Sequence, residues 1–155
     1  LDRNDILYKF QSGFRVNRST DTSLSYLNNK IMNGFDNKSY IGMILIDLQK
    51  AFDTIDHEIF LNKIKCLGFP NSSVSWYKSY LESRYFKVNI GSSLSEKEEF
   101  RCGVPQRSII GPLMFLIYIN DMAQAVGCDL YLFADDACLV YTGTDIKEIE
   151  YNLEF

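Results

Sequence analysis

The chain has 155 residues, 46% of them apolar and 14% aromatic, which is enough to bury the core of one domain and excludes a disordered or low-complexity chain. Its formal net charge of −4 excludes a uniformly basic surface, so any contact with nucleic acid must rest on local groups of Lys and Arg. The longest apolar run, residues 113–119, falls far short of the roughly 20 residues that cross a bilayer, so we expect no membrane partner.

The cysteines and the first residues indicate the compartment. The four cysteines are far apart in the sequence and the chain has one His, a pattern that excludes a zinc knuckle and is typical of reduced thiols. Residues 1–5 are polar and begin without Met, so we expect no signal peptide and a piece of a longer protein. These features predict an intracellular location, in the cytoplasm, the nucleus or both.

The first third of the chain predicts a loop followed by one helix. Residues 11–18 have the composition of a loop. Ser19 or Thr20 can cap the helix that follows, and we expect this helix to end at Gly34. Its apolar stripe consists of Leu24, Leu27 and Ile31.

The middle of the chain predicts a strand, two helices and a pair of strands. Residues 40–46 are rich in β-branched and large apolar side chains and predict a buried strand that ends at Asp47. Asp56 can cap a second helix, and Asn71 opens a third. Two paired strands complete this part, at residues 85–90 and 98–102.

The last third predicts a loop, a buried helix, a hairpin and a final helix. After the loop at 103–111, Pro112 suits the first turn of a helix that is apolar on every side. Residues 131–140 place two adjacent acids between apolar runs, a pattern typical of a β-hairpin with acids at its tip. Thr144 or Asp145 begins the last helix. Because strands and helices do not alternate strictly, we expect an α+β fold with helices on one face of a small antiparallel sheet.

The adjacent acids Asp135 and Asp136 are the most informative residues of the sequence. On its own the pair is typical of a plain hairpin turn. Two like charges repel each other, however, and a divalent cation between them relieves that repulsion. Asp47, at the end of an apolar strand, is a candidate third ligand. Three such carboxylates can hold two Mg²⁺ ions about 3.5–4 Å apart, the arrangement that supports in-line phosphoryl transfer.

Two loops carry groups suited to a phosphate or a base. In residues 103–108, Gln106 offers both a donor and an acceptor ahead of a helix N-terminus. The structural alternative is a helix cap formed by Ser108. Residues 11–20 hold Arg15, a second arginine and an aromatic, which suit phosphates and a stacked base. The alternative for this second loop is a solvated basic segment.

Five segments in this order resemble one family: QSGFRVNRST, IDLQKAFDTIDH, WYKSYLESR, GVPQRSIIGPLMFLIYINDM and YLFADDACLV. The chain resembles the reverse transcriptase domain of non-LTR, LINE-type and jockey-like, retrotransposons. The resemblance implies one α+β domain fragment, a polymerase palm with a small antiparallel sheet backed by helices. Residues 1–38 are then partial fingers and residues 39–155 a palm truncated at its C-terminus, with the thumb absent.

The resemblance also implies the catalytic groups and the partners. Asp47, Asp135 and Asp136 match the palm aspartates that bind two Mg²⁺ ions, for which Mn²⁺ is a possible substitute. The implied reaction is that of an RNA-directed DNA polymerase, a nucleotidyltransferase that adds dNTPs to the 3′-OH of a DNA primer on an RNA template. Nothing in the sequence fixes an oligomeric state.

Three further residues match nucleotide-binding positions of the family. Phe52 matches the aromatic gate that stacks under the incoming sugar and clashes with a ribose 2′-OH. Gln106 matches the glutamine that lies along the incoming nucleotide, and Arg15 matches a fingers residue near the triphosphate or template. We interpret three nearby polar residues as structural, in a turn, a helix cap and a helix start: Asp53, Asp56 and His57.

Arg107 departs from the family pattern, which has Gly after Pro-Gln. If this position needs a positive φ, Arg costs about 1 kcal/mol in backbone strain, and its bulk can obstruct the template. Two alternatives therefore remain open beside the polymerase core. One is a catalytically inactive fragment of a decayed element, and the other is a non-catalytic RNA-binding module on the same sheet.

Overall fold

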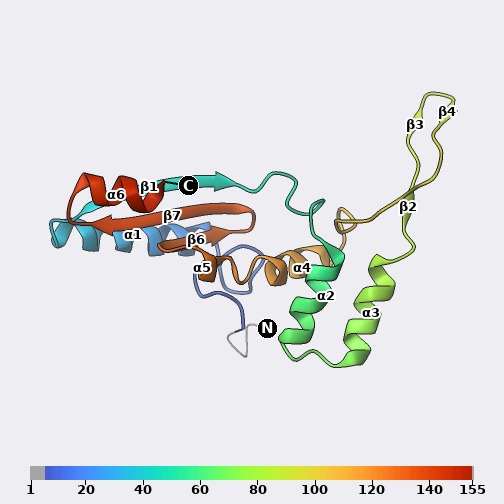
Figure 1. Cartoon of the computed structure of the whole chain (residues 1–155), viewed down its shortest axis with the longest axis horizontal. Helices are drawn as coiled ribbons and strands as arrows, with labels where there is room; N and C mark the ends of the chain where they lie inside the picture. Colours follow the sequence, from blue (N-terminus) through green and yellow to red (C-terminus); the bar gives the residue numbers. More distant parts are fainter. Residues whose placement is uncertain (1–5, 155) are drawn as a thin grey trace. The chain divides into compact units, whose positions relative to one another are not determined.

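The computed structural model describes residues 6–154, which form two compact units. The sheet unit comprises the described residues up to 49 and from 119 onward, and the helical unit comprises residues 50–118. The elements of both are drawn in Figure 1. They confirm a mixed α and β fold with a small antiparallel sheet and helices. No helix within residues 6–154 has the length and apolar character needed to cross a membrane.

The sheet unit is built on three antiparallel strands in the order β1-β7-β6. Their bounds are β1 Tyr40–Asp47, β6 Asp129–Phe133 and β7 Asp136–Gly143. Because β7 is the central strand, β1 pairs on one side only and alternates between half-buried and exposed residues. Leu45 on β1 is 77% exposed, so the prediction of a buried strand at 40–46 was wrong in burial although right in position.

Helices lie on both faces of this sheet rather than on the one face that we expected (Figure 1). A Cβ placed on Gly34 of α1 (Thr20–Asp36) would lie 2.5 Å from Cδ1 of Ile41. A Cβ placed on Gly42 would lie 2.3 Å from Cγ2 of Ile149 in α6 (Ile146–Leu153). Since neighbouring strand residues point to opposite faces, α1 packs on one face of β1 and α6 on the other.

The face toward α1 carries an aromatic core. Tyr131 on β6 packs with Cys138 and Val140 of β7, and the ring of Phe10 lies 4.9 Å from that of Tyr131. Burial, helped by the nearby Asp129 carboxylate, raises the pKa of Tyr131 to about 12.

The α1 helix begins as predicted but differs from its prediction in two later details, the exposure of Leu24 and the place of Gly34. Ser19 is its N-cap and accepts a hydrogen bond from the backbone of Thr22, as expected for a capping residue. Leu24, however, is 61% exposed, because Tyr26 and Leu27 face the core instead. Gly34 lies inside the helix rather than at its end, and its lack of a side chain lets α1 approach β1.

The helical unit consists of three helices around an apolar core. They are α2 (His57–Cys66), α3 (Asn71–Leu81) and α4 (Gly111–Tyr118). Asp56 caps α2 by accepting a hydrogen bond of 2.9 Å from the backbone of Ile59, as predicted. Phe60 is fully buried and its ring lies 5.3 Å from that of Tyr77 on α3. The all-round apolar α4 is buried, also as predicted.

An exposed arm of four short strands joins α3 to the loop before α4. The pairs are β2 (Tyr85–Phe86) with β5 (Glu98–Glu99), and β3 (Asn89–Ile90) with β4 (Ser93–Leu94). The prediction of two long paired strands at 85–90 and 98–102 holds only for β2 and β5. The β3 strand pairs instead with β4, which lies between the two predicted segments. The turn of the outer pair contains Gly91, whose φ is 61°.

Hydrogen bonds of the Gly103 backbone join the loop before α4 to the segment before α2. Its backbone N–H donates to the carbonyl of Ile55 at 2.8 Å, and its carbonyl oxygen lies 2.7 Å from Nε2 of His57. Gly103 has a φ of 81°, and a Cβ here would lie 2.7 Å from the carbonyl oxygen of Asp53. The position therefore needs both the conformation and the small size of glycine.

Hydrogen bonds to Glu148 connect the start of α6 to the end of β7. Its carboxylate accepts hydrogen bonds from the backbone N–H and the hydroxyl of Thr144, at 2.6 and 2.9 Å, and from the Tyr141 hydroxyl at 3.1 Å. These donors, the Thr144 backbone first, lower the pKa of Glu148 below its ordinary value of 4.5. Asp145 caps the helix, as predicted.

We expect Gly103→Ala to destabilise the protein more than Gly91→Ala. Both glycines have a positive φ, which costs a residue with a Cβ about 1 kcal/mol. Only Gly103 would also collide with backbone atoms, adding about 1–3 kcal/mol, since Gly91 has open space around it. Urea unfolding of the two variants measures the difference. Equal losses would contradict the close approach of the two loops.

We expect the contribution of Glu148 to stability to disappear in acid. Its pKa is lower in the folded than in the unfolded chain, so its contribution is complete above about pH 4.5 and is lost as the pH falls through the folded pKa. The urea midpoint of the unsubstituted chain should exceed that of Glu148→Gln at about pH 6 and approach it at about pH 3. A difference that does not change with pH would contradict the prediction.

Candidate active site

The predicted acidic hairpin is present in the sheet unit. Phe133 pairs with Asp136, which leaves Ala134 and Asp135 as the two residues of the turn between β6 and β7. Asp136, the first residue of β7, is exposed, and Asp135 is half-buried. Ala134 has a φ of 55°, the left-handed region that residues with a Cβ seldom adopt.

Strand pairing brings Asp47 to the same end of the sheet. Asp47, the last residue of β1, lies directly opposite Asp136 in the antiparallel ladder. Directly opposite residues project from the same face, with their Cβ atoms about 4.5–5.5 Å apart. The backbone N–H of Leu48 donates to the carbonyl of Asp135 at 3.3 Å, which joins the two chain segments beyond the ladder. Residues that are nearly 90 positions apart in sequence therefore meet at one sheet end.

The three acids fit a hard divalent cation by the chemistry of their donors. Carboxylate oxygens are the ligands that Mg²⁺ and Mn²⁺ prefer, and all three residues are accessible to solvent. Within residues 6–154, no group of three or more His, Cys, Asp or Glu side chains could hold a metal ion as the side chains stand. The backbone thus positions the acids, and their assignment as metal ligands stays a prediction.

Gln11 is a residue of this region that we did not single out from the sequence. Its side chain is 3% exposed. Its Oε1 accepts hydrogen bonds from the N–H groups of Gly13 (2.7 Å) and Ala134 (3.0 Å), and its Nε2 donates to the Ala134 carbonyl (3.2 Å). The available signal was Gly13, since a glycine beside a polar residue often marks a close backbone approach.

Arg15 lies in the loop that follows Gln11. Its Nη1 donates to the carbonyl oxygens of Tyr8 (2.9 Å) and Gln11 (3.2 Å), and the residue is half-buried. These bonds hold the loop against the segment before it. The predicted contact of Arg15 with a triphosphate or template stays a prediction.

Phe52 and Gln106 belong to the helical unit. The ring of Phe52 lies 5.1 Å from that of Phe115 on α4, and its carbonyl accepts a hydrogen bond of 2.9 Å from the backbone of Val104. Gln106 is exposed, and its Nε2 donates to Oδ1 of Asp53 at 3.3 Å. The two loops that carry these residues are therefore neighbours, while their nucleotide-binding roles stay predictions.

The residues interpreted as structural have the predicted positions. Asp53 lies in a turn, Asp56 caps α2 and His57 is the first residue of that helix. Ser108 accepts a hydrogen bond of 2.9 Å from the N–H of Gly111 at the start of α4, a contact of the kind that the structural alternative for this loop predicted.

Arg107 has the strained conformation that its departure from the family pattern suggested. Its φ is 61°, and the residue is exposed in the loop before α4. A glycine adopts this conformation without the steric cost of a Cβ, so the family's glycine is explained by backbone geometry.

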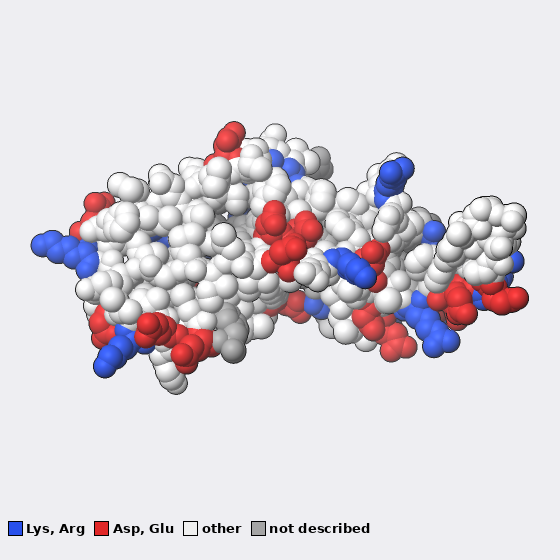
Figure 2. All heavy atoms as spheres, turned by 90° about the horizontal axis from the view of Figure 1, so that it is seen from above, with Lys and Arg blue, Asp and Glu red and all other residues white. Residues whose placement is uncertain are grey.

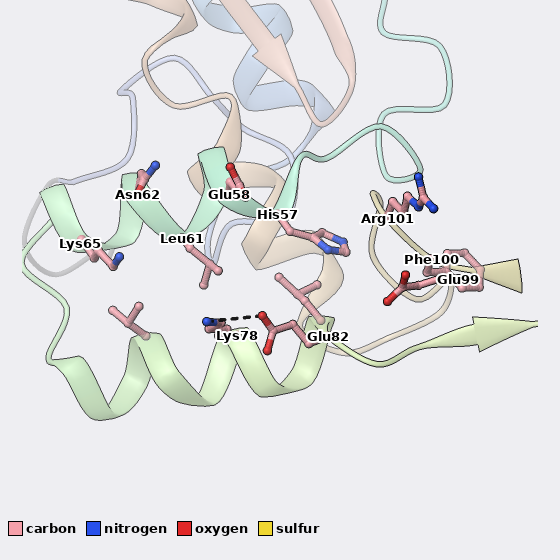
Figure 3. A pocket seen from close by; sticks show the side chains of 12 residues that line it. His57, Glu58, Leu61, Asn62, Lys65, Lys78, Glu82, Glu99, Phe100 and Arg101 are labelled. Atoms are coloured by element: carbon pink, nitrogen blue, oxygen red, sulfur yellow. Dashed lines mark ion pairs between the residues drawn. The ribbon is translucent and has the colours of Figure 1, made fainter.

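A pocket of about 530 Å³ lies in the helical unit, between α2, α3 and the segment after β5 (Figure 3). Lys65, Lys78 and Arg101 contribute positive charge to its rim. Three acids offset them, and the Lys78 ammonium lies 3.5 Å from the Glu82 carboxylate. None of the predicted site residues lines this pocket.

The distribution of charge differs between the two units. The helical unit holds nine Lys and Arg against seven Asp and Glu, whereas the rest of the chain holds seven against thirteen. Figure 2 shows acidic and basic side chains interspersed, with no continuous basic surface on the face drawn. This agrees with the expectation from the net charge that the surface is not uniformly basic.

We expect Arg107→Gly to leave the free energy of unfolding unchanged or to raise it by up to about 1 kcal/mol, because the steric cost of a positive φ that it removes exceeds or balances the entropic cost of glycine. Arg101→Gly is the matched control, since Arg101 is also exposed in this segment but has no positive φ. The control should lose about 0.5–1 kcal/mol, the entropic cost of glycine. Urea unfolding reports both values, and a loss of stability in Arg107→Gly would contradict the interpretation.

Comparison with known proteins identifies the family. Residues 3–153 match the family model described as reverse transcriptase (RNA-dependent DNA polymerase). The chain is 36% identical over 157 residues to the probable RNA-directed DNA polymerase from transposon BS of Drosophila melanogaster, a match that covers 96% of this chain and 17% of that protein.

Two other relatives from Drosophila melanogaster are also named as RNA-directed DNA polymerases. The probable RNA-directed DNA polymerase from transposon X-element is 34% identical over 147 residues, 91% of this chain and 16% of the relative. The RNA-directed DNA polymerase from mobile element jockey is 36% identical over 114 residues, 74% of this chain and 12% of the relative. The chain thus spans about a sixth or less of the length of these relatives. It belongs to the reverse transcriptase family, and the relatives named here are encoded by transposons and mobile elements.

Proposed function

We propose that this chain is the catalytic core of an RNA-directed DNA polymerase that copies a retrotransposon. It would add dNTPs to the 3′-OH of a DNA primer on an RNA template. The observation that carries the proposal is the register that sets Asp47 opposite Asp136, beside Asp135 in the turn. Family membership supports the same reaction.

The three acids would hold two Mg²⁺ ions, or Mn²⁺ in their place. Metal ions in such a pair activate the attacking hydroxyl and stabilise the charge on the phosphoryl oxygens. Asp47 and Asp136 offer carboxylates from neighbouring strands, so their spacing is set by the ladder rather than by a mobile loop. Asp135 adds a third carboxylate from the tight turn.

The other predicted residues would select and hold the nucleotide. The ring of Phe52 is supported by Phe115, and a ring held in this way can stack under a deoxyribose and exclude a ribose 2′-OH. Gln106 is exposed and offers an amide to the nucleotide. The guanidinium of Arg15 suits the triphosphate or the template backbone. The partners would be RNA, DNA and dNTPs, in the cytoplasm, the nucleus or both.

A catalytically inactive copy of such a polymerase is the second candidate. Arg107 favours it, because a left-handed φ of 61° is unusual for Arg and its long side chain stands where the family has none. In this case the fold is retained while the template path next to Gln106 is obstructed.

We expect Asp136→Ala, introduced into a longer polymerase that carries this core, to lower primer extension by at least about 1,000-fold. Loss of a metal ligand removes several kcal/mol of transition-state stabilisation, and each 1.36 kcal/mol is tenfold in rate. Asp36→Ala, which removes an exposed carboxylate at the end of α1, should leave extension unchanged. Extension undiminished in Asp136→Ala would refute the assignment.

The same assay distinguishes the two candidates. Extension with Mg²⁺ or Mn²⁺ by the core carrying Arg107 supports an active polymerase. Extension that appears only in Arg107→Gly supports an inactive copy whose acids remain in place.

A further inference from the structure

The turn that carries the acids is strained. Ala134 precedes Asp135 and Asp136 and has a φ of 55°. A residue with a Cβ disfavours this region, so the turn needs restraint from outside the hairpin. The direction of the Asp135 side chain depends on the backbone of this one residue, whereas Asp136 is held by its pairing with Phe133 and Asp47.

The amide of Gln11 supplies that restraint. The N–H of Ala134 belongs to the peptide plane before its Cα, and its carbonyl belongs to the plane after it. Gln11 binds the N–H through Oε1 at 3.0 Å and the carbonyl through Nε2 at 3.2 Å. One side-chain amide therefore holds the two planes whose relative rotation is defined by the φ and ψ angles of Ala134.

Burial and neighbouring contacts fix the amide itself. Gln11 is 3% exposed, so water does not compete for these bonds. Its Oε1 also accepts the N–H of Gly13 at 2.7 Å, and two N–H donors on one side establish which end of the amide is oxygen.

The backbone around Gln11 is joined to β6. Ser12 donates to the Leu132 carbonyl at 2.8 Å, and Leu132 donates to the Phe10 carbonyl at 3.0 Å. A Cβ on Gly13 would lie 2.1 Å from the Ala134 nitrogen, so this segment packs directly against the turn.

We propose that Gln11 is a positioning residue of the polymerase site, which holds the Ala134 turn so that Asp135 stays beside the paired Asp47 and Asp136, where the three acids would bind a shared pair of cations. It touches no reacting group and acts through the backbone of Ala134. This inference rests on the proposed function, because it assumes that the acids bind divalent metal.

The test measures Mn²⁺ affinity of the full chain by electron paramagnetic resonance, which needs no polymerase activity. Gln11→Met keeps the volume of the side chain and removes its hydrogen bonds. We expect about 10- to 100-fold weaker Mn²⁺ binding, the usual effect of losing a residue that orients metal ligands. The Ala134 amide should also exchange its hydrogen faster in NMR spectra.

Ser12→Ala is the matched control. Ser12 is adjacent, 1% exposed, and its hydroxyl is one of the buried polar atoms of residues 6–154 that have no hydrogen-bond partner. Its loss should leave Mn²⁺ affinity and Ala134 exchange unchanged. An equal weakening in Ser12→Ala and Gln11→Met would overturn the proposal, because a general loss of packing would then explain both.

A double-mutant cycle separates positioning from simple stability. Glycine adopts a positive φ freely, so Ala134→Gly removes the need for restraint. Gln11→Met should weaken Mn²⁺ binding clearly less in the Ala134→Gly background than in the unsubstituted chain. If Gln11→Met alone does not fold, a folded double variant with Mn²⁺ affinity close to that of Ala134→Gly supports the proposal. If Gln11→Met weakens Mn²⁺ binding equally in the unsubstituted chain and in the Ala134→Gly background, the proposal is overturned.

Failure of this inference and failure of the proposed function give different results. If the unsubstituted chain binds Mn²⁺ and Asp136→Ala does not, but Gln11→Met binds as tightly as the unsubstituted chain, the positioning role is wrong and the function stands. If the unsubstituted chain binds no Mn²⁺, the metal assignment of the acids is wrong and the positioning role is overturned with it.

Discussion

The antiparallel register between β1 and β7 is the constraint on which the candidate active site depends. It sets Asp47 opposite Asp136, although neither residue has a local reason to meet the other. A shift of one residue would move Asp47 to the opposite face, because strand side chains alternate. The two-residue turn adds Asp135, and Gln11 holds the backbone of that turn. The arrangement of the three acids thus follows from backbone pairing more than from side-chain packing.

The two units differ in their balance of charged residues. The sheet unit carries the excess of acids, including the three that would bind metal, whereas the helical unit has a small excess of Lys and Arg. A negative net charge for the whole chain therefore does not contradict a polymerase core. Carboxylates that bind cations count toward that negative charge, and basic groups suited to phosphates are set apart from them in the sequence.

Local patterns in the sequence predicted most elements, because caps, turns and apolar spacing act over a few residues. Asp56 and Asp145 cap the helices they were expected to cap, and the acidic hairpin is present. Burial was harder to predict: composition suggested a buried strand at 40–46, but β1 has a neighbour on one side only. Gln11 was also hard to recognise: Gly13 indicated a close backbone approach, but the partner of Gln11, Ala134, is 123 residues away in the sequence. The assignment of Phe52 and Gln106 to nucleotide binding rests on resemblance alone.

Gly42 has a consequence that extends beyond its own position. Helix α6 lies so close over this residue that a Cβ would meet Ile149 and Leu153. Sliding β1 by one position along β7 would place Ile41 or Met43 beneath the helix, where neither side chain fits. Gly42 therefore helps to set the register of β1. This residue without a side chain, five positions before Asp47, keeps the acid that we propose as a metal ligand on the same face as Asp136.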